Sequence, residues 1–176
     1  MDVRIEDSTS DYVFAHWDRV VLVVWRGRTT LSSVRLGEQV FEQHASRCAG
    51  PVLLLTIVEP AAPLPALEAR MELVAFLRRG AGRIERSALV FEGEGFRAAS
   101  VRAVVAGMSL FSRPAYPHRV FSSVSGAARF LAGGKGGSPT PHLLIRAVRD
   151  ARQPSGTSTY VPWIPVPPYP GAPLRR

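Results

Sequence analysis

Residues 87–111, SALVFEGEGFRAASVRAVVAGMSLF, are organised as a strand, a glycine turn and a long apolar helix. Ser87–Phe91 is a short apolar run of the kind that parallel strands show when helices cover both faces of their sheet. Gly93 and Gly95 then supply a tight turn. From Phe96 onward, apolar side chains recur at helical spacing, which predicts a helix with one buried face. The rest of the chain repeats this plan.

The other strands are predicted from runs of β-branched, aromatic and aliphatic residues bounded by turn signals. These runs are 12–16, 19–25, 52–58 and 118–122. The other helices are predicted from apolar residues that recur every three or four positions. They extend from Thr29 or Thr30 to Cys48, over 66–79, and over 123–131 behind a Ser123 cap. In the helix 66–79, the apolar stripe consists of Leu67, Met71, Val74 and Leu77.

The order of these elements is β-β-α-β-α-β-α-β-α, and it predicts an α/β domain over residues 12–132. We expect a mixed, mostly parallel five-stranded sheet with four helices, because strands that alternate with helices pair in parallel through right-handed crossovers. The first two strands are joined by only two residues and should form an antiparallel hairpin. Residues 1–11 are predicted to be an N-terminal arm or an edge strand.

Residues 133–176 are predicted to be a disordered, basic tail rich in glycine and proline. From Lys135 onward, proline occupies nine of 42 positions, and such a composition buries too little apolar surface to order itself. Within the tail, residues 142–149 are expected to form at most an isolated turn or strand. Residues 161–170, VPWIPVPPYP, favour polyproline II.

The proline-rich part of the tail has the composition of a docking segment. Such a segment binds in an aromatic-lined groove of a partner, or on the edge of its own domain's sheet. The alternative is an inert extension. The side chains that would make the contact are Pro162, Trp163, Pro165, Pro168 and Tyr169.

The charge and hydropathy of the sequence limit the kinds of partner and the cellular location that are expected for this protein. Of the formal net charge of +8, residues 135–176 contribute six basic side chains and one acidic, so the predicted domain is nearly balanced. Its aromatic residues fall on core positions, whereas a nucleic-acid surface needs them exposed among basic residues, so nucleic acid is not expected. The longest apolar runs are too short to cross a bilayer. With a single cysteine, Cys48, and no secretion signal, a cytoplasmic location is expected.

The order of elements, with VVLVVWRG at 20–27 before a threonine-capped helix, resembles the STAS and SpoIIAA-like domains, whose topology is related to that of lipid-carrying SEC14-type domains. Residues 117–131, PHRVFSSVSGAARFL, look like the last strand and helix of SpoIIAA-like members. The resemblance covers about residues 12–132 and implies a regulatory or partner-binding domain. Phospho-regulated STAS proteins carry a serine after the central strand. This chain has EPAAPLPA at 59–66 and lacks the phosphorylatable serine.

The segment Gly93-Glu-Gly-Phe-Arg-Ala98 matches G-x-G-x-x-A between a strand and a helix. Backbone N–H groups and the helix dipole can hold a phosphate at such a turn. An anion or nucleotide site here would use Gly93, Gly95 and Arg97, with Glu59 from the end of a neighbouring strand. The alternative is a plain tight turn, because Glu94 would repel an anion and the motif follows the fourth predicted strand rather than the first.

No constellation of side chains predicts catalysis, a metal or a cofactor. Glu59 and Glu92 follow strand ends at one sheet edge, and an enzyme built on them would need both carboxylates in one pocket. His44 and Cys48 lie four residues apart on a helix, but a zinc site takes about four ligands and no second pair has suitable spacing.

These observations favour a non-enzymatic regulatory or scaffolding domain that acts by binding another protein. The alternative function is the binding of a small ligand, which would be an anion, a nucleotide or a lipid. That ligand would use the glycine turn or a cavity under the predicted helix at residues 101–111.

Overall fold

The computed structural model describes residues 3–93, 99, 103, 104, 107, 114–134 and 139–153. Six strands and four helices have defined bounds in these ranges. The strands are β1 (Arg4–Ser8), β2 (Tyr12–Trp17), β3 (Val20–Trp25), β4 (Val52–Val58), β5 (Ile84–Phe91) and β6 (His118–Phe121). The helices are α1 (Leu31–Ala45), α2 (Leu67–Arg79), α4 (Val124–Ala132) and α5 (Pro141–Arg152). Most of the predicted helix that follows Gly95 lies outside the described residues, and its described positions 99, 103, 104 and 107 are helical.

The strands form one mixed sheet in which every strand lies beside its neighbour in sequence, in the order β1-β2-β3-β4-β5-β6. β1, β2 and β3 pair antiparallel, and β3 to β6 pair in parallel. The predicted hairpin and the predicted parallel crossovers are therefore confirmed. The mixed α/β class is confirmed as well, with six strands where five were expected.

The extra strand is β1, which falls within the predicted N-terminal arm or edge strand. It pairs with β2 along the open edge of the sheet. Side-chain contacts reinforce the pairing, since Glu6 accepts from Arg4 Nε and contacts His16 Nε2 of β2 at 2.8 Å. The short alternation of Val3 and Ile5 carried too little signal to separate a strand from an arm.

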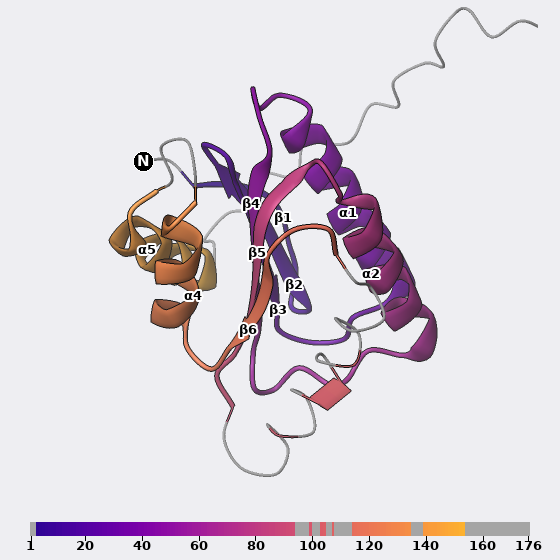
Figure 1. The fold of residues 1–176 in the computed structure, drawn as a ribbon. Coiled ribbons are helices and arrows are strands. Elements are labelled where there is room, and N and C mark those ends of the chain that lie inside the picture. Colours follow the sequence, from indigo (N-terminus) through magenta and orange to yellow (C-terminus); the bar gives the residue numbers. More distant parts are fainter. Residues whose placement is uncertain are drawn as a thin grey trace, which may run out of the picture.

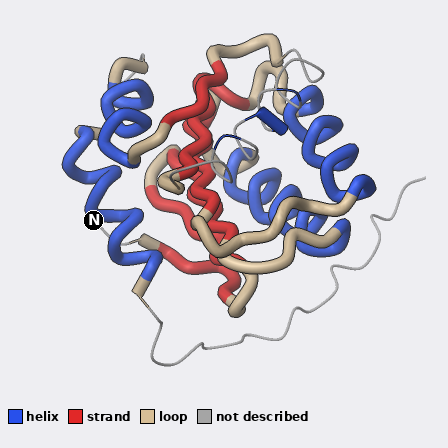
Figure 2. The backbone as a smooth tube through the Cα atoms, turned by 90° about the horizontal axis from the view of Figure 1, so that it is seen from below, coloured by secondary structure: helices blue, strands red, loops and turns tan. Residues whose placement is uncertain are grey.

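Helices cover both faces of the sheet, as the apolar central strands predict. α1 and α2 lie on one face, and α4 and α5 lie on the other (Figures 1 and 2). Consequently β4, with the sequence VLLLTIV, has five of its seven residues buried. Leu53, Leu55 and Ile57 face the α4/α5 layer, whereas Leu54 faces the α1/α2 layer.

The helix starts follow the predicted capping residues. Thr30 caps α1, where its side chain accepts a hydrogen bond from the Ser33 N–H at 3.1 Å and Ser33 Oγ accepts one from the Thr30 N–H in return. Ser123 caps α4 by accepting from the Gly126 N–H at 3.3 Å. These side chains satisfy N–H groups that the first turn of a helix leaves without a backbone partner.

α5 corrects the predicted tail. Residues 141–152 form a helix, not an isolated turn or strand, so the ordered part of the chain does not end at 132. Thr140 is the N-cap and Pro141 occupies the first turn, where its missing N–H costs nothing. One face of the helix is fully buried on the sheet and against α4, and consists of Leu144, Ala147, Val148 and Ala151.

Candidate functional site

An apolar cavity of about 100 Å³ lies between the α1/α2 layer and the sheet. Strands β2 to β6 supply its floor, α1 and α2 supply its walls, and the connector at 62–65 closes one side. Four aromatic side chains line it: Phe14, Trp25, Phe41 and Phe76. Val104, from the predicted helix after the glycine turn, lines it too. A cavity under that helix was one of the two ligand sites expected from the sequence.

The floor of the cavity is visible as a row of half-buried residues in the middle of an otherwise buried sheet. Val23, Thr56 and Leu89 are directly opposite one another on β3, β4 and β5. All three line the cavity and keep part of their surface accessible, whereas Val21, Leu54 and Ser87, two positions earlier on the same face of the sheet, are only 1%, 2% and 1% exposed. The helix layer therefore does not seal the sheet at this row.

The position of α2 explains the gap. Ala69 is its one fully buried residue, and Leu73, Phe76 and Leu77 turn toward the cavity. The predicted stripe of α2 is wrong in its first half, because Leu67 and Met71 are 64% and 63% exposed. Pro63 and Pro65 fix the course of the connector that precedes α2. The helix therefore begins with the side chains of Leu67 and Met71 pointing toward solvent. The helix packs mainly beside α1, where Phe76 meets the Phe41 ring edge to face at 5.1 Å.

Three polar side chains interrupt the apolar floor. Thr56 lies on β4, Ser87 on β5 and His118 opposite Ser87 on β6. Ser87 is almost completely buried, and burial lowers the pKa of His118, so its imidazole is neutral at pH 7. At the wall, Glu38 is occupied by Arg79, whose Nε and Nη2 each donate to one carboxylate oxygen at 2.7 Å. The described lining of the cavity thus offers hydroxyl groups and a neutral imidazole, and the Glu38 carboxylate is already paired.

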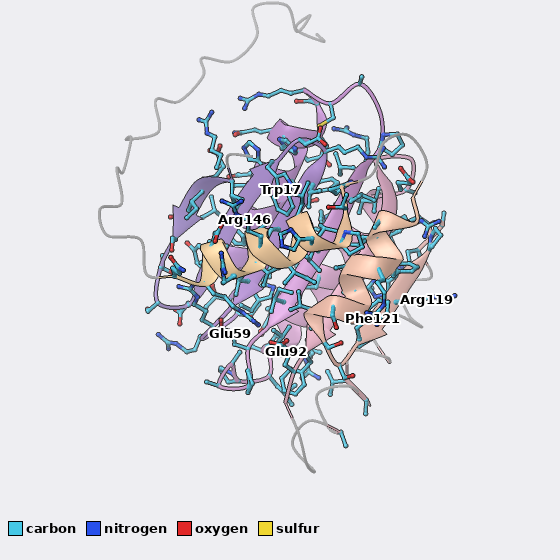
Figure 3. All side chains as sticks on the ribbon, turned by 90° about the vertical axis from the view of Figure 1, so that its left-hand side faces the viewer. Trp17, Glu59, Glu92, Arg119, Phe121 and Arg146 are labelled. Atoms are coloured by element: carbon cyan, nitrogen blue, oxygen red, sulfur yellow. The ribbon has the colours of Figure 1, made fainter. Side chains whose placement is uncertain are left out.

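Glu59, predicted as part of an anion site, does not line the cavity. It lies at the end of β4 close to Glu92, and both contact one guanidinium (Figure 3). Arg152 Nη2 donates to Glu92 at 2.8 Å, and Arg152 Nε lies 3.5 Å from Glu59. Arg26 also approaches Glu59 at 3.9 Å and donates to the Ala151 carbonyl at 2.8 Å. The two carboxylates do converge, but on the C-terminal end of α5, which they hold against the sheet.

Of the residues predicted from the glycine motif, Gly93 is described and Gly95 and Arg97 lie outside the described residues. A β-carbon at Gly93 would collide with the ring of Phe91. Close packing on a buried aromatic side chain therefore explains this glycine. The predicted tail residues Pro162, Trp163, Pro165, Pro168 and Tyr169 also lie outside the described residues.

His16, His44 and Cys48 form a second polar cluster where α1 meets β2. The two imidazole rings stack with centroids 4.0 Å apart. His16 contacts Glu6, and His44 Nε2 lies 3.6 Å from Cys48 Sγ. Within the described ranges, no three His, Cys, Asp or Glu side chains are grouped so that they could hold a metal ion. Burial raises the pKa of the Cys48 thiol, so this cysteine is not activated as a nucleophile.

The histidines predict how stability changes with pH. Burial, reinforced by His16, lowers the pKa of His44, and burial lowers that of His118. The unfolded chain, with histidine pKa near 6.5, therefore binds more protons than the folded chain in the range below about pH 6.5. We expect the urea midpoint to be constant above that range and to fall between pH 6.5 and 5. His44→Gln should weaken this dependence without removing it, because His118 remains, and the exposed His142→Gln should leave it unchanged. An unchanged or rising midpoint on acidification would contradict this assignment.

The cavity was expected only as one alternative, but the sequence does hold a signal for it. Thr56 interrupts the apolar run VLLLTIV, and Ser87 begins the apolar run SALVF. A polar residue in a strand that is covered on both faces requires a hydrogen-bonding partner or a space that admits one. Thr56 and Ser87 lie on neighbouring strands, so the two polar residues indicate the same region of the sheet.

No known family model matches this sequence, and no curated protein matches it. Among solved structures, one match is the crystal structure of an uncharacterized protein from the DUF3478 family with a SpoIIAA-like fold, from Shewanella loihica PV-4. It is 15% identical to this chain, covers 74% of this chain and 92% of its own, and has a TM-score of 0.44. The fold named for that protein is the one that the sequence resembles.

None of the helices formed by the described residues combines the length and the apolar character needed to cross a membrane.

Proposed function

We propose that this chain is a non-enzymatic domain that binds a small, mainly apolar molecule in the cavity between α1, α2 and the sheet. The observation that carries the proposal is the accessible row Val23–Thr56–Leu89 under a lining of aromatic side chains. A sheet that is merely packed would bury this row, as it buries Val21, Leu54 and Ser87 two positions earlier on the same face. The proposal favours the small-ligand alternative and assigns the ligand to the cavity rather than to the glycine turn.

The size of the cavity supports a ligand of about one ring. A cavity of roughly 150 Å³ lined by aliphatic and aromatic side chains is large enough to bind benzene. At about 100 Å³, the cavity here is of the same order. Apolar burial drives binding in such a site, and a few placed polar groups set the orientation.

The polar groups of the floor favour a neutral ligand with one hydrogen-bonding group. Thr56 and Ser87 carry hydroxyl groups, and the lowered pKa of His118 keeps its imidazole uncharged. Since Glu38 is neutralised by Arg79, no unpaired positive side chain lines the cavity among the described residues. A phosphate or other strong anion would lose its hydration here without gaining a counter-ion, which argues against the anion and nucleotide alternatives.

Phenol and toluene test the proposal as a pair, because they have the same shape and differ in one hydroxyl group. Both are expected to raise the melting temperature of the full-length chain, by the linkage between binding and stability. Phenol should bind about two- to tenfold more tightly, since a net hydrogen bond contributes about 0.5–1.5 kcal/mol. If neither compound shifts the melting temperature at millimolar concentration, the cavity is not a site for ligands of this class.

Binding to another protein, the first function expected from the sequence, stays a prediction. The apolar side chains that α2 leaves exposed are compatible with it.

A further inference from the structure

Three exposed apolar side chains gather at the start of α2 and in the connector before it. Leu64, Leu67 and Met71 are 47%, 64% and 63% exposed, and they account for three of the five large apolar residues exposed in the described part of the chain. Leu67 and Met71 are four residues apart on one face of the helix, and Leu64 lies in the connector three positions before Leu67. We call these three residues the α2 patch. Leu64 also lines the cavity, so the patch adjoins its rim.

The end of α5 lies beside the segment that leads to this patch. Arg152 is bound to Glu92 and contacts Glu59, and Arg26 holds the Ala151 carbonyl. Glu59 is the first residue of the connector that runs through Leu64 to α2. Figure 3 shows Glu59 and Glu92 together at this end of the sheet. Arg152, at the C-terminal end of α5, is therefore held next to the connector by ion pairs, and residues 154–176 follow it in the sequence.

The chain lengths make contact between the two segments feasible. Leu64, the first residue of the α2 patch, follows Glu59 by five positions, so the patch begins at most about 18 Å from Glu59, at roughly 3.5 Å per residue. Trp163 follows Arg152 by eleven residues, which reach about 38 Å when extended. The tail thus reaches the patch with length to spare, and a tether of this kind gives an effective concentration on the order of millimolar.

The chemistry of the tail fits an apolar surface. Residues 160–169, YVPWIPVPPY, alternate prolines with aromatic and β-branched residues and carry no charge. Polyproline II needs no internal hydrogen bonds and is already favoured in the free chain, so ordering such a segment costs little conformational entropy. By contrast, a partner from solution would have to compete with this tethered segment.

We propose that residues 160–169 dock on the α2 patch of their own chain. This docking does not depend on the binding of a ligand in the cavity. Because Leu64 belongs to both surfaces, the docked segment would border the rim of the cavity. The contact is apolar, so it should persist at high salt, unlike the ion pairs that anchor Arg152.

Tryptophan fluorescence of the full-length chain tests the docking. Trp17 and Trp25 are each 5% exposed, and the third tryptophan is Trp163. The difference between the parent chain and Trp163→Phe therefore isolates the emission of Trp163. We expect this emission to be poorly quenched by acrylamide. The double substitution Leu67→Asp/Met71→Asp should raise its quenching constant several-fold, and Ile145→Asp, at an exposed position on α5, should leave it unchanged.

Three results would overturn the docking. The first is full quenching of Trp163 in the parent chain. The second is protection that survives the Leu67→Asp/Met71→Asp substitutions, which would place the segment elsewhere. The third is protection that disappears on dilution, which would assign the patch to a second copy of the chain. Circular dichroism of each variant verifies that α2 remains folded, and the single substitution Met71→Asp serves if the double variant does not fold.

Discussion

Replacing Leu144 by alanine is expected to lower the free energy of unfolding by about 3 kcal/mol, within the range of 2–5 kcal/mol typical of buried leucines. Leu144 is completely buried between α5, α4 and the sheet. The substitution removes apolar contacts and leaves a space that the neighbouring strands cannot fill. Urea unfolding monitored by circular dichroism measures the effect.

The matched control is Ile145→Ala, one residue further along the same helix. Ile145 is 40% exposed, so the same reduction in size should cost less than about 1 kcal/mol. A tail that is disordered from residue 133 onward would make both substitutions equally harmless. Equal and small effects at the two positions would therefore contradict the placement of α5 in the core.

Replacing Val23 by phenylalanine is expected to abolish the binding of phenol, with at least a tenfold loss of affinity. Val23 lies at the β3 end of the accessible row, and the larger ring would occupy the space that the ligand needs. Because this substitution fills a cavity rather than overpacking a dense core, the melting temperature of the free chain should be maintained or raised. Isothermal titration and thermal unfolding measure the two effects separately.

Val120→Phe provides the matched control for this substitution. Val120 is opposite Leu89 on β6 and is half-buried, but it does not line the cavity. Phenol should bind to this variant as it binds to the parent chain. Unchanged binding in Val23→Phe would mean that phenol binds elsewhere, and equal losses in the two variants would indicate a general disturbance of the sheet.

The architecture was predictable where strong local signals agree with one another. The run Val52–Val58 is too apolar for anything but a central strand, and Thr30 and Ser123 are N-caps in sequence and in structure. The alternation of strands and helices then leaves few topologies, because crossovers between parallel strands are right-handed. The hairpin, the parallel pairing and the helical cover of the central strands follow from these features.

α5 was missed because composition was averaged over the whole C-terminal region. The local signals were present: Thr140-Pro141 is an N-cap followed by a proline in the first turn, and Leu144, Ala147, Val148 and Ala151 have helical spacing. The many prolines after residue 153 diluted them. The helix is further stabilised by Arg152 with Glu59 and Glu92, and contacts between residues so distant in sequence cannot be inferred from spacing.

The cavity is harder to predict, because it depends on how far a helix stands from the sheet. In α2, the stripe through Leu67 and Met71 is as regular as the stripe that turns inward through Leu73 and Leu77. Periodicity alone does not choose between two such faces. The choice depends on the prolines at 63 and 65 and on the packing of Phe76 against Phe41, which are properties of the folded chain.

Intermolecular nuclear Overhauser effects from phenol to methyl groups of the full-length chain test the binding site most directly. The proposed site predicts contacts from the ligand ring to the methyl groups of Val23, Leu73 and Leu89, which line the cavity from β3, α2 and β5. The exposed methyl groups of Ile145, on the opposite face of the sheet, should show none. Contacts confined to exposed side chains, or no contacts at saturating phenol, would contradict the proposal that this domain holds a small apolar molecule under α2.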